Sequence, residues 1–384
     1  MPRKMLELIA GFHLPPLALS ERGEPVRNCT EWKERRKEIL GLLQREMYGT
    51  TPSPCPVAGS VLKEDDMAYS GKAVERFLEI HLAAPGGNVS FPATLVIPKK
   101  RPVRGIFVNI AFMVAGMDGF RYCPVCPIEE IIDEGFAIAM YDYLDVAGDD
   151  DDFNKGLAGV FPRKEDTGWG KLGIWAYSMS RVADYLRTLD VFKAVPFAAA
   201  GFSRLGKAAL WCGAQDEGFD FVIPFGSGTG GAGFTRRNRK ESMEELLRRN
   251  WFWFCGNFRR YATDAGTLPF DQHFVIAACA PRKFLTLIAE DDIWADVENE
   301  YLSCVAASEG YRLSGARGFI APDSIPRADA FFPEGDIAMG LRRGTHFLSR
   351  ADWRLAMDYI GRTGKARPSG RSGMSRGGKN LRIF

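Results

Sequence analysis

The sequence predicts an α/β fold, in which a mostly parallel sheet is covered by helices on both faces. Short, nearly continuous apolar segments recur at residues 105–110, 136–141, 197–200, 220–224 and 284–289. Such runs are typical of strands that are buried on both faces of a sheet. Segments with helical spacing of apolar residues lie between them, and this alternation favours a parallel sheet. The 384 residues, of which 46% are hydrophobic, are sufficient for one large core.

The first fifty residues are predicted to form a leader with one helix that packs on the following domain. Thr30 is an acceptable N-cap for that helix, and Trp32, Ile39, Leu42 and Leu43 recur at helical spacing. Two extended segments at 74–83 and 93–97 come next, and a short helix at 128–133 connects the first two buried strands. Further helices are predicted at residues 170–189, 208–214, 240–249 and 351–360.

Charge and composition exclude several classes of partner. The net charge of +2 gives no strong field for nucleic acid or a membrane surface, and no apolar run is long enough to span a bilayer. The N-terminus lacks the apolar stretch of a signal peptide, so we expect a cytoplasmic protein or the trimmed form of a secreted one. The eight cysteines are scattered, and the pair Cys123 and Cys126 has no second pair with which to bind zinc. The acidic run at 149–152 lacks EF-hand spacing and is predicted to be a solvated loop.

The most informative segment runs from Gly201 to Lys207, with the sequence Gly-Phe-Ser-Arg-Leu-Gly-Lys. It lies between a predicted strand and a predicted helix, an arrangement that exposes the nucleophilic serine of α/β-hydrolases. The small Gly201 is expected to let the backbone take the strained turn that Ser203 needs. The usual pattern has glycine two residues after the serine, whereas here Leu205 takes that position and Gly206 follows. We expect an α/β-hydrolase fold, a three-layer sandwich with a mostly parallel central sheet.

A serine nucleophile needs a base within hydrogen-bond reach, and histidine is the usual one because its pKa lies near operating pH. The chain has four histidines: His13, His81, His273 and His346. The order serine, acid, histidine found in α/β-hydrolases excludes the first two. His273 precedes an apolar run and is expected to be structural. His346 lies in a loop before the last predicted helix, and it is the predicted base.

The acid that orients the imidazole is expected on a loop after a late strand. The segment at 290–296, Glu-Asp-Asp-Ile-Trp-Ala-Asp, directly follows the predicted strand at 284–289 and carries four carboxylates. Position alone leaves all four as candidates. Three of them are expected to be helix N-caps or solvent-facing residues.

Taken as an ordered set, these and further motifs resemble the glucuronoyl esterases of carbohydrate esterase family 15, in their bacterial form. The serine motif of that family reads Gly-x-Ser-Arg-x-Gly-Lys, which has the glycine spacing found here. The resemblance covers about residues 14–361. Besides the serine motif, it is carried by Met47-Tyr48-Gly49, Gly228-Thr229-Gly230-Gly231-Ala232, Leu268-Pro269-Phe270-Asp271-Gln272-His273, Ala280-Pro281-Arg282, Asp292-Ile293-Trp294-Ala295-Asp296 and Gly344-Thr345-His346.

The resemblance implies hydrolysis of the ester between 4-O-methylglucuronic acid on xylan and an alcohol, such as a lignin alcohol. The expected substrate is glucuronoxylan or a uronate-ester oligosaccharide. Matched residue by residue, Ser203 is the nucleophile, His346 is the base and Arg204 is the arginine that stabilises the oxyanion. Lys207 matches a lysine that contacts sugar hydroxyls, and Trp294 matches a tryptophan that lines the uronate pocket.

One departure from the family concerns the acid. Many members carry a glutamate where this chain has Gly226, which has no side chain. Some bacterial relatives instead use an aspartate after the following strand, and Asp292 matches that position, with Asp291 as the alternative. A carbohydrate acetyl esterase of the same fold and a non-catalytic carbohydrate-binding relative are the competing interpretations. The intact Ser203 and His346 argue against the second.

No metal ion or organic cofactor is expected, because the serine, histidine and aspartate supply the acyl-transfer chemistry by themselves. Three segments are expected along the chain. These are a leader at 1–50, an α/β-hydrolase catalytic domain at 51–362, and a disordered basic tail at 363–384 that is rich in Gly, Ser, Lys and Arg.

Overall fold

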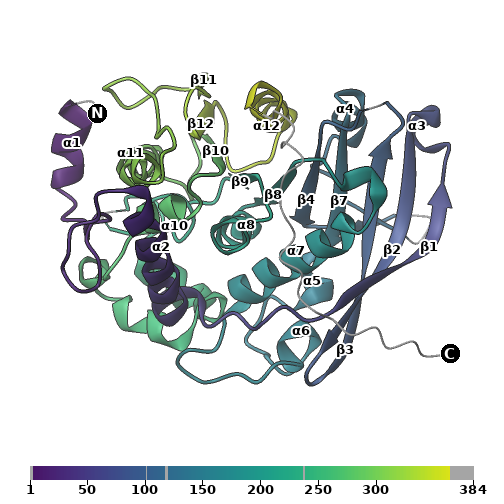
Figure 1. Ribbon diagram of the computed structural model, residues 1–384, viewed down its shortest axis with the longest axis horizontal. Coiled ribbons are helices and arrows are strands. Elements are labelled where there is room, and N and C mark those ends of the chain that lie inside the picture. Colours follow the sequence, from purple (N-terminus) through teal and green to yellow (C-terminus); the bar gives the residue numbers. More distant parts are fainter. Residues whose placement is uncertain (1–2, 101, 117–119, 237, 364–384) are drawn as a thin grey trace.

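The computed structural model describes residues 3–100, 102–116, 120–236 and 238–363 (Figure 1). Beyond Thr363, the predicted basic tail lies outside the described residues. Within them the main sheet has ten strands in the order β1-β2-β3-β7-β4-β8-β9-β10-β12-β11. These strands are β1 (Val57–Asp65), β2 (Ala73–Ala84), β3 (Gly87–Pro98), β4 (Gly105–Ala111), β7 (Phe136–Asp142), β8 (Phe197–Phe202), β9 (Phe221–Phe225), β10 (Lys283–Ala289), β11 (Ala330–Phe332) and β12 (Ile337–Arg342).

The centre of the sheet is parallel. The strands β7, β4, β8, β9, β10 and β12 all run the same way, while β1 to β3 extend one side and β11 the other in antiparallel pairing. The carboxyl ends of parallel strands meet at one edge of a sheet, which is where ligands bind in open α/β folds. The loops that follow β8, β10 and β12 therefore gather at that edge.

Helices cover both faces of the sheet. Figure 1 shows α4 and α12 on one side and α7, α8 and α10 on the other. The helices are α1 (Arg3–Ala10), α2 (Cys29–Leu43), α3 (Ala68–Gly71), α4 (Ile128–Asp133), α5 (Tyr143–Val146), α6 (Gly156–Gly159), α7 (Lys171–Arg187), α8 (Arg204–Gln215), α9 (Met243–Asn250), α10 (Gln272–Ala278), α11 (Val297–Leu313) and α12 (Arg350–Thr363). Short helical turns include η1 (Gln44–Tyr48), η2 (Asp190–Phe192), η3 (Trp251–Trp253), η4 (Gly256–Tyr261) and η5 (Ala265–Thr267).

Side chains of the central strands alternate between two apolar cores. Ile106 and Val108 of β4 belong to the core beneath α7 and α8, whereas Phe107 lies in the core beneath α12. There its ring meets the ring of Trp353 edge-on, with the centroids 5.3 Å apart. This two-sided burial explains why the central strands are apolar throughout. The predicted three-layer α/β architecture is confirmed.

The N-terminal helices pack on the same body as the rest of the chain. Met5 of α1 is fully buried in a cluster that also contains Leu302 of α11. Trp32 of α2 is buried against α11, where a Cβ atom at Gly310 would lie 2.6 Å from its ring. The cap of α2 differs from the prediction, because Asn28 rather than Thr30 accepts the hydrogen bond from the Glu31 N–H. Asparagine caps a helix at least as well as threonine does.

Several elements extend or add to what the sequence predicts. The segment at 93–97 is the second half of the longer strand β3, and β1, β12, α10 and α11 have no predicted counterpart. Each of the eight cysteines lies in the described part of the chain as a free thiol, and seven are buried. Among the described residues, every helix is too short or too polar to cross a membrane.

Candidate active site

The turn between β8 and α8 places Ser203 at the carboxyl edge of the sheet. Its backbone has φ +59° and ψ −125°, in a region that residues other than glycine rarely adopt. The Ser203 N–H donates to the carbonyl oxygen of Phe225 at 2.8 Å, which ties the turn to the end of β9. Backbone strain of this kind persists only where the surroundings impose it, and it recurs at functional sites.

Two glycines make room for the turn. A Cβ atom at Gly201 would lie 2.3 Å from the carbonyl oxygen of Leu205, so the first turn of α8 folds back directly over this glycine. Gly201 is therefore required for this close approach rather than for its own φ, which refines the sequence-based expectation. A Cβ atom at Gly206 would lie 2.9 Å from the Phe225 carbonyl oxygen. The shifted glycine of the serine motif thus lets α8 pack against the end of β9.

The side chains of Ser203, His346 and Asp292 form one chain of hydrogen bonds. His346 Nε2 lies 2.9 Å from Ser203 Oγ, and His346 Nδ1 lies 2.7 Å from Asp292 Oδ2. The imidazole ring also stacks on Phe202, with the ring centroids 4.7 Å apart. With its proton on Nδ1, facing the carboxylate, the imidazole presents Nε2 as an acceptor to the serine hydroxyl.

The parallel pairing of β10 with β12 explains how Asp292 and His346, which are 54 positions apart in the sequence, come into contact. The strands stay in register up to Ala289 opposite Arg342, and both loops then leave the same edge of the sheet. The Glu290 N–H donates to the Arg342 carbonyl oxygen at 2.9 Å, and the Asp291 N–H donates to the Gly344 carbonyl oxygen at 3.0 Å. These bonds carry the pairing past the strands and bring Asp292 beside His346.

Burial separates the two aspartates that the sequence leaves as alternatives. Asp292 is 2% exposed, and its second oxygen, Oδ1, accepts the Trp294 N–H at 2.8 Å. Asp291 is exposed to solvent. The carboxylate in contact with the imidazole is that of Asp292.

Gly226 faces the imidazole from the opposite loop. Its φ is +52°, and a Cβ atom there would lie 3.5 Å from His346 Cε1 and 3.1 Å from the Phe202 ring. The family resemblance predicts a glutamate at this position in many glucuronoyl esterases. A side chain at 226 would therefore point at the histidine, and in this chain Asp292 supplies the carboxylate from the other side.

A cavity of about 310 Å³ opens directly onto Ser203 and His346. Its other lining residues are Phe112, Phe202, Arg204, Lys207, Gly226, Ser227, Glu241, Arg249, Asn250, Trp253 and Trp294. Five of the six residues that the sequence predicts for the site line this cavity, and the sixth, Asp292, contacts the imidazole of His346. The wall combines aromatic rings with several charged side chains, which suits a polar ligand that has apolar faces.

The polar wall of the cavity is built around a buried ammonium group. Lys207 lies one helical turn after Ser203, and its Nζ donates to the Ser227 carbonyl oxygen at 2.5 Å. Burial lowers the pKa of Lys207, and the nearby carboxylates of Glu241 and Glu300 oppose that effect. Glu241 is itself buried and accepts a hydrogen bond from Arg249 Nη2 at 2.8 Å.

Arg249 also connects this polar wall to the aromatic wall. Its guanidinium carbon lies 4.8 Å from the centroid of the Trp294 ring, within cation–π range. The indole is thus held at the cavity edge by an arginine that is itself paired with Glu241. The Trp294 ring lines the cavity, where the face of a sugar could stack on it.

Glu300 of α11 supports the glycine-rich loop from behind. Its two oxygens accept the Gly228 N–H at 3.1 Å and the Thr286 hydroxyl at 2.8 Å. The side chain is fully buried, and burial raises the pKa of Glu300 to about 7. Glu300 therefore holds the loop that bears Gly226 and Ser227 without lining the cavity itself.

Sequence reasoning missed part of the cavity wall. A helix was predicted at residues 240–249, but the sequence did not indicate that this segment and the turn after it line the cavity. They contribute Glu241, Arg249 and Trp253 to its wall. Trp251 is half-buried and packs on the Arg259 guanidinium. The described residues hold no group of three or more His, Cys, Asp or Glu side chains suited to a metal ion.

His273 belongs to the core and lies apart from the serine, as the sequence predicts for a structural histidine. Its Nε2 lies 3.2 Å from the Pro15 carbonyl oxygen, and burial lowers the pKa of His273 to about 3. The imidazole is therefore neutral at ordinary pH. It contacts the rings of Phe234 and Phe274 edge-on.

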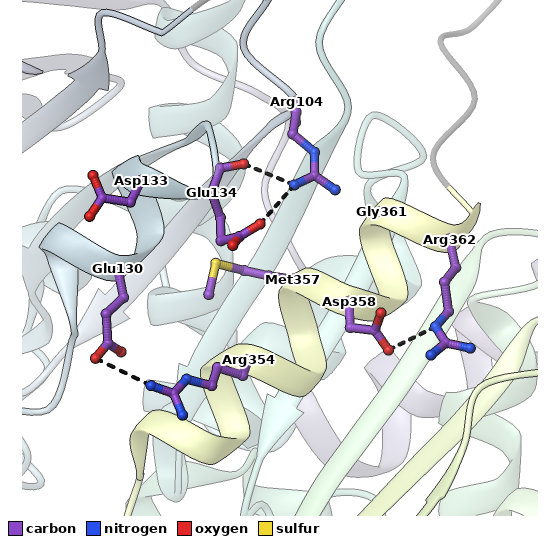
Figure 2. Close-up of a pocket in the computed structure, with 9 residues that line it drawn as sticks. All are labelled: Arg104, Glu130, Asp133, Glu134, Arg354, Met357, Asp358, Gly361 and Arg362. Carbon is purple, nitrogen blue, oxygen red and sulfur yellow. Dashed lines mark hydrogen bonds and ion pairs between the residues drawn. The ribbon is translucent and has the colours of Figure 1, made fainter. Parts of the chain in front are cut away.

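A second cavity, of about 520 Å³, lies between α4 and α12 (Figure 2). Arg104, on its wall, directly precedes β4, so this cavity is at the amino edge of the sheet, opposite Ser203. Figure 2 shows that the arginines on its wall are paired, Arg104 with Glu134, Arg354 with Glu130 and Arg362 with Asp358. It presents ion pairs rather than a nucleophile and base, and so it is not the candidate active site.

Comparison with known proteins identifies the family. The family model described as glucuronyl esterase, fungi, matches residues 80–315, which is more than half of the chain. The chain belongs to the glucuronoyl esterase family. Family membership makes it a carboxylic ester hydrolase, in agreement with the prediction from the sequence.

Individual esterases resemble the chain along most of its length. A solved glucuronoyl esterase of carbohydrate esterase family 15 from Teredinibacter turnerae T7901 superposes with a TM-score of 0.82, at 27% identity, over 92% of this chain and 89% of that one. Carbohydrate esterase MZ0003, from an unknown prokaryotic organism, is 26% identical over 91% of this chain and 89% of its own length. A 4-O-methyl-glucuronoyl methylesterase from Phanerochaete carnosa is 25% identical over 73% of this chain and 67% of its own length.

Proposed function

We propose that the chain hydrolyses esters of 4-O-methylglucuronic acid, such as those that join glucuronoxylan to lignin alcohols, by a Ser-His-Asp acyl-enzyme mechanism. The observation that carries the proposal is the continuous hydrogen-bond chain from Ser203 through His346 to Asp292, beside a cavity with a buried ammonium group. Membership of the family supports the substrate class.

In the acylation step, His346 Nε2 takes the proton of Ser203 as the hydroxyl oxygen attacks the uronoyl carbonyl. The imidazolium that forms is stabilised by the buried carboxylate of Asp292. The tetrahedral intermediate then collapses, the bond to the alcohol breaks, and His346 gives its proton to the departing alcohol oxygen. The uronate is left esterified to Ser203.

Negative charge develops on the former carbonyl oxygen during this step. The Arg204 N–H is the first of α8, and the initial N–H groups of a helix have no partner within it and lie at its positive end. The Arg204 guanidinium lines the same cavity and brings a full positive charge. Each well-placed donor of this kind is worth about 3 kcal/mol in the transition state.

In the deacylation step, His346 takes a proton from a water molecule whose oxygen attacks the acyl carbonyl. Ser203 leaves as its alkoxide and recovers the proton from His346, which frees the uronate and restores the starting state. The cycle consumes one water molecule per ester.

The cavity wall supports a sugar acid as the acyl part of the ester. Lys207 can donate to sugar hydroxyls, Glu241 can accept from them, and the Trp294 ring can stack on the face of a pyranose. A volume of about 310 Å³ suits one sugar ring. A long acyl chain would require an apolar wall in place of two buried charges.

The test is a pair of assays on the purified chain. Methyl 4-O-methylglucuronate should be hydrolysed much faster than an acetylated xylo-oligosaccharide, and Ser203→Ala should abolish the turnover of both. Preference for the acetylated sugar would make the chain an acetyl esterase. Binding of uronate-bearing xylan without turnover would identify a non-catalytic relative, and activity retained in Ser203→Ala would refute the mechanism.

A further inference from the structure

The residues of the acidic run at 149–152 differ in their exposure to solvent. Asp150 and Asp151 are exposed, as a solvated loop predicts, but the Asp149 side chain is only 14% exposed. The loop follows α5 and brings Asp149 toward the first residue of α8. The prediction of a solvated loop is therefore wrong for Asp149.

The Asp149 carboxylate receives donors from three separate segments of the chain. Its Oδ1 accepts the indole N–H of Trp253 at 2.7 Å. Its Oδ2 accepts the Tyr143 hydroxyl at 3.3 Å and a hydrogen bond from Arg204 Nη1. Burial, with the Asp149 charge as the next contribution, raises the pKa of Tyr143 to about 12, so this hydroxyl keeps its proton and remains a donor. Both carboxylate oxygens are thus engaged.

The Arg204 guanidinium is enclosed on more than one side. Its carbon atom lies 4.8 Å from the centroid of the Trp253 ring and 5.9 Å from that of Phe112, and both rings line the cavity. Asp149 engages one terminal nitrogen, while Nε has no partner among the described residues. A guanidinium has five N–H donors, so the group keeps donors that the ion pair does not use.

We propose that Asp149 is a positioning residue that holds the Arg204 guanidinium at the oxyanion site of the proposed esterase. Arginine has a long, flexible side chain, and stabilisation of a transition state requires its donors to be in place before charge develops. Asp149 and Trp253 fix the guanidinium through the carboxylate and the indole ring, and Trp253 in turn holds the carboxylate. This inference rests on the proposed function, because it assigns the oxyanion to Arg204.

The test is a double-mutant cycle with Asp149→Asn and Arg204→Ala, assayed on methyl 4-O-methylglucuronate. Asp149→Asn keeps the shape of the side chain but removes its charge, and kcat should fall about 10- to 100-fold, the cost of a misplaced catalytic group. KM should change by less than about threefold, because the loss falls on the transition state. In the Arg204→Ala background the same change should alter kcat by no more than about twofold.

A matched control is Asp151→Asn, which makes the same chemical change two residues away at an exposed site and should leave kcat unchanged. If Asp149→Asn is poorly folded in a thermal melt, Trp253→Phe replaces it in the cycle, since it removes the N–H donor and keeps a ring. Losses that add fully in the Arg204→Ala background, or wild-type kcat in the single variant, would overturn the proposal.

The outcome is separable from that of the proposed function. If the wild type cleaves 4-nitrophenyl acetate but no glucuronate ester, the substrate proposal fails, and the same cycle is run on the acetate. A loss of kcat on Asp149→Asn that appears while Arg204 is present and disappears in the Arg204→Ala background would then still support Asp149 as the positioning residue, because the oxyanion forms in either ester. Additive losses on the acetate would overturn it.

Discussion

Replacement of Asp292 by asparagine should reverse the proton arrangement on His346. The Oδ1 atom of Asp292 accepts the Trp294 N–H at 2.8 Å, so the single oxygen of an asparagine is expected to keep that bond. Its amide nitrogen would then face His346 Nδ1, where Oδ2 lies 2.7 Å away in the native chain. An amide N–H can only donate, and the imidazole would therefore carry its proton on Nε2, where it cannot accept from Ser203.

The expected loss is large because both roles of the carboxylate disappear together. The wrong tautomer removes the base, and the imidazolium would lose its buried counter-charge, since Asp292 is 2% exposed. The same change in a Ser-His-Asp protease costs about 10⁴-fold in kcat, which corresponds to about 5.5 kcal/mol of transition-state stabilisation. The fold should be preserved, because asparagine has the same shape and keeps the bond to Trp294.

The assay is the steady-state hydrolysis of methyl 4-O-methylglucuronate, with Asp291→Asn as the matched control on the exposed neighbouring carboxylate. Asp292→Asn should lose nearly all kcat with little change in melting temperature, and Asp291→Asn should remain within about twofold of the native rate, as surface changes usually do. A native rate for Asp292→Asn, or the large loss in Asp291→Asn instead, would refute this account of the acid.

Three further predictions follow from the site and its support. Lys207→Met should raise KM for methyl glucuronate about 10- to 100-fold by removing a charged donor to the sugar, and an unchanged KM in steady-state assays would contradict that role. Burial raises the pKa of Glu300 to about 7, so the folded state holds a proton that the unfolded chain releases near pH 4.5, and folding stability falls as pH rises between these values. In urea titrations, the free energy of unfolding of the native chain should therefore fall by about 3 kcal/mol more than that of Glu300→Gln between pH 4 and 8. The same pH dependence in both proteins would contradict this prediction. Gly201→Ala should destabilise the chain, because the added Cβ would lie 2.3 Å from the Leu205 carbonyl oxygen. The control Gly41→Ala, in an open part of α2, should stabilise the chain by about 0.5–1 kcal/mol. Equal melting temperatures of the two variants would refute the close approach at Gly201.

Most of the buried strands were predictable because their signal is local. The apolar run at 197–200 corresponds to β8 and the run at 136–141 to β7, and the helix at 128–133 has the bounds of α4. Most of these strands are apolar at nearly every position and are therefore visible within their own few residues, whereas β12, which is also buried, was not predicted. The serine turn was visible for the same reason, since strand, turn and helix are contiguous in the chain.

Elements with mixed patterns were not predictable in the same way. The strand β1 is exposed at most positions and pairs with β2 at the edge of the sheet, so it carries little apolar signal. The helix α11 is buried around much of its surface because other helices and β12 cover it, and polar residues such as Asn299 and Glu300 are among its buried positions, so it lacks a clear amphipathic stripe. The fold, rather than the local sequence, determines both elements.

The candidate site likewise contains residues that the sequence predicts and residues that it does not. Ser203, Asp292 and His346 each follow a strand, in the chain order that is typical of α/β-hydrolases, so chain order and family resemblance were sufficient to propose them. Asp149 and Glu241 carry no such signal, because each reaches the site through a long loop and its contacts exist only after folding. An acidic run and a polar helix start are more often solvated, and nothing in the local sequence distinguishes these two positions.

The most direct test of the central claim is covalent labelling of the nucleophile. A fluorophosphonate ester should modify Ser203 of the native chain stoichiometrically and abolish esterase activity, with the added mass located on the peptide that contains Ser203. His346→Ala should slow this labelling by orders of magnitude, because the hydroxyl loses its base at 2.9 Å. An active enzyme that remains unlabelled at Ser203, or labelling that is equally fast without His346, would contradict the account.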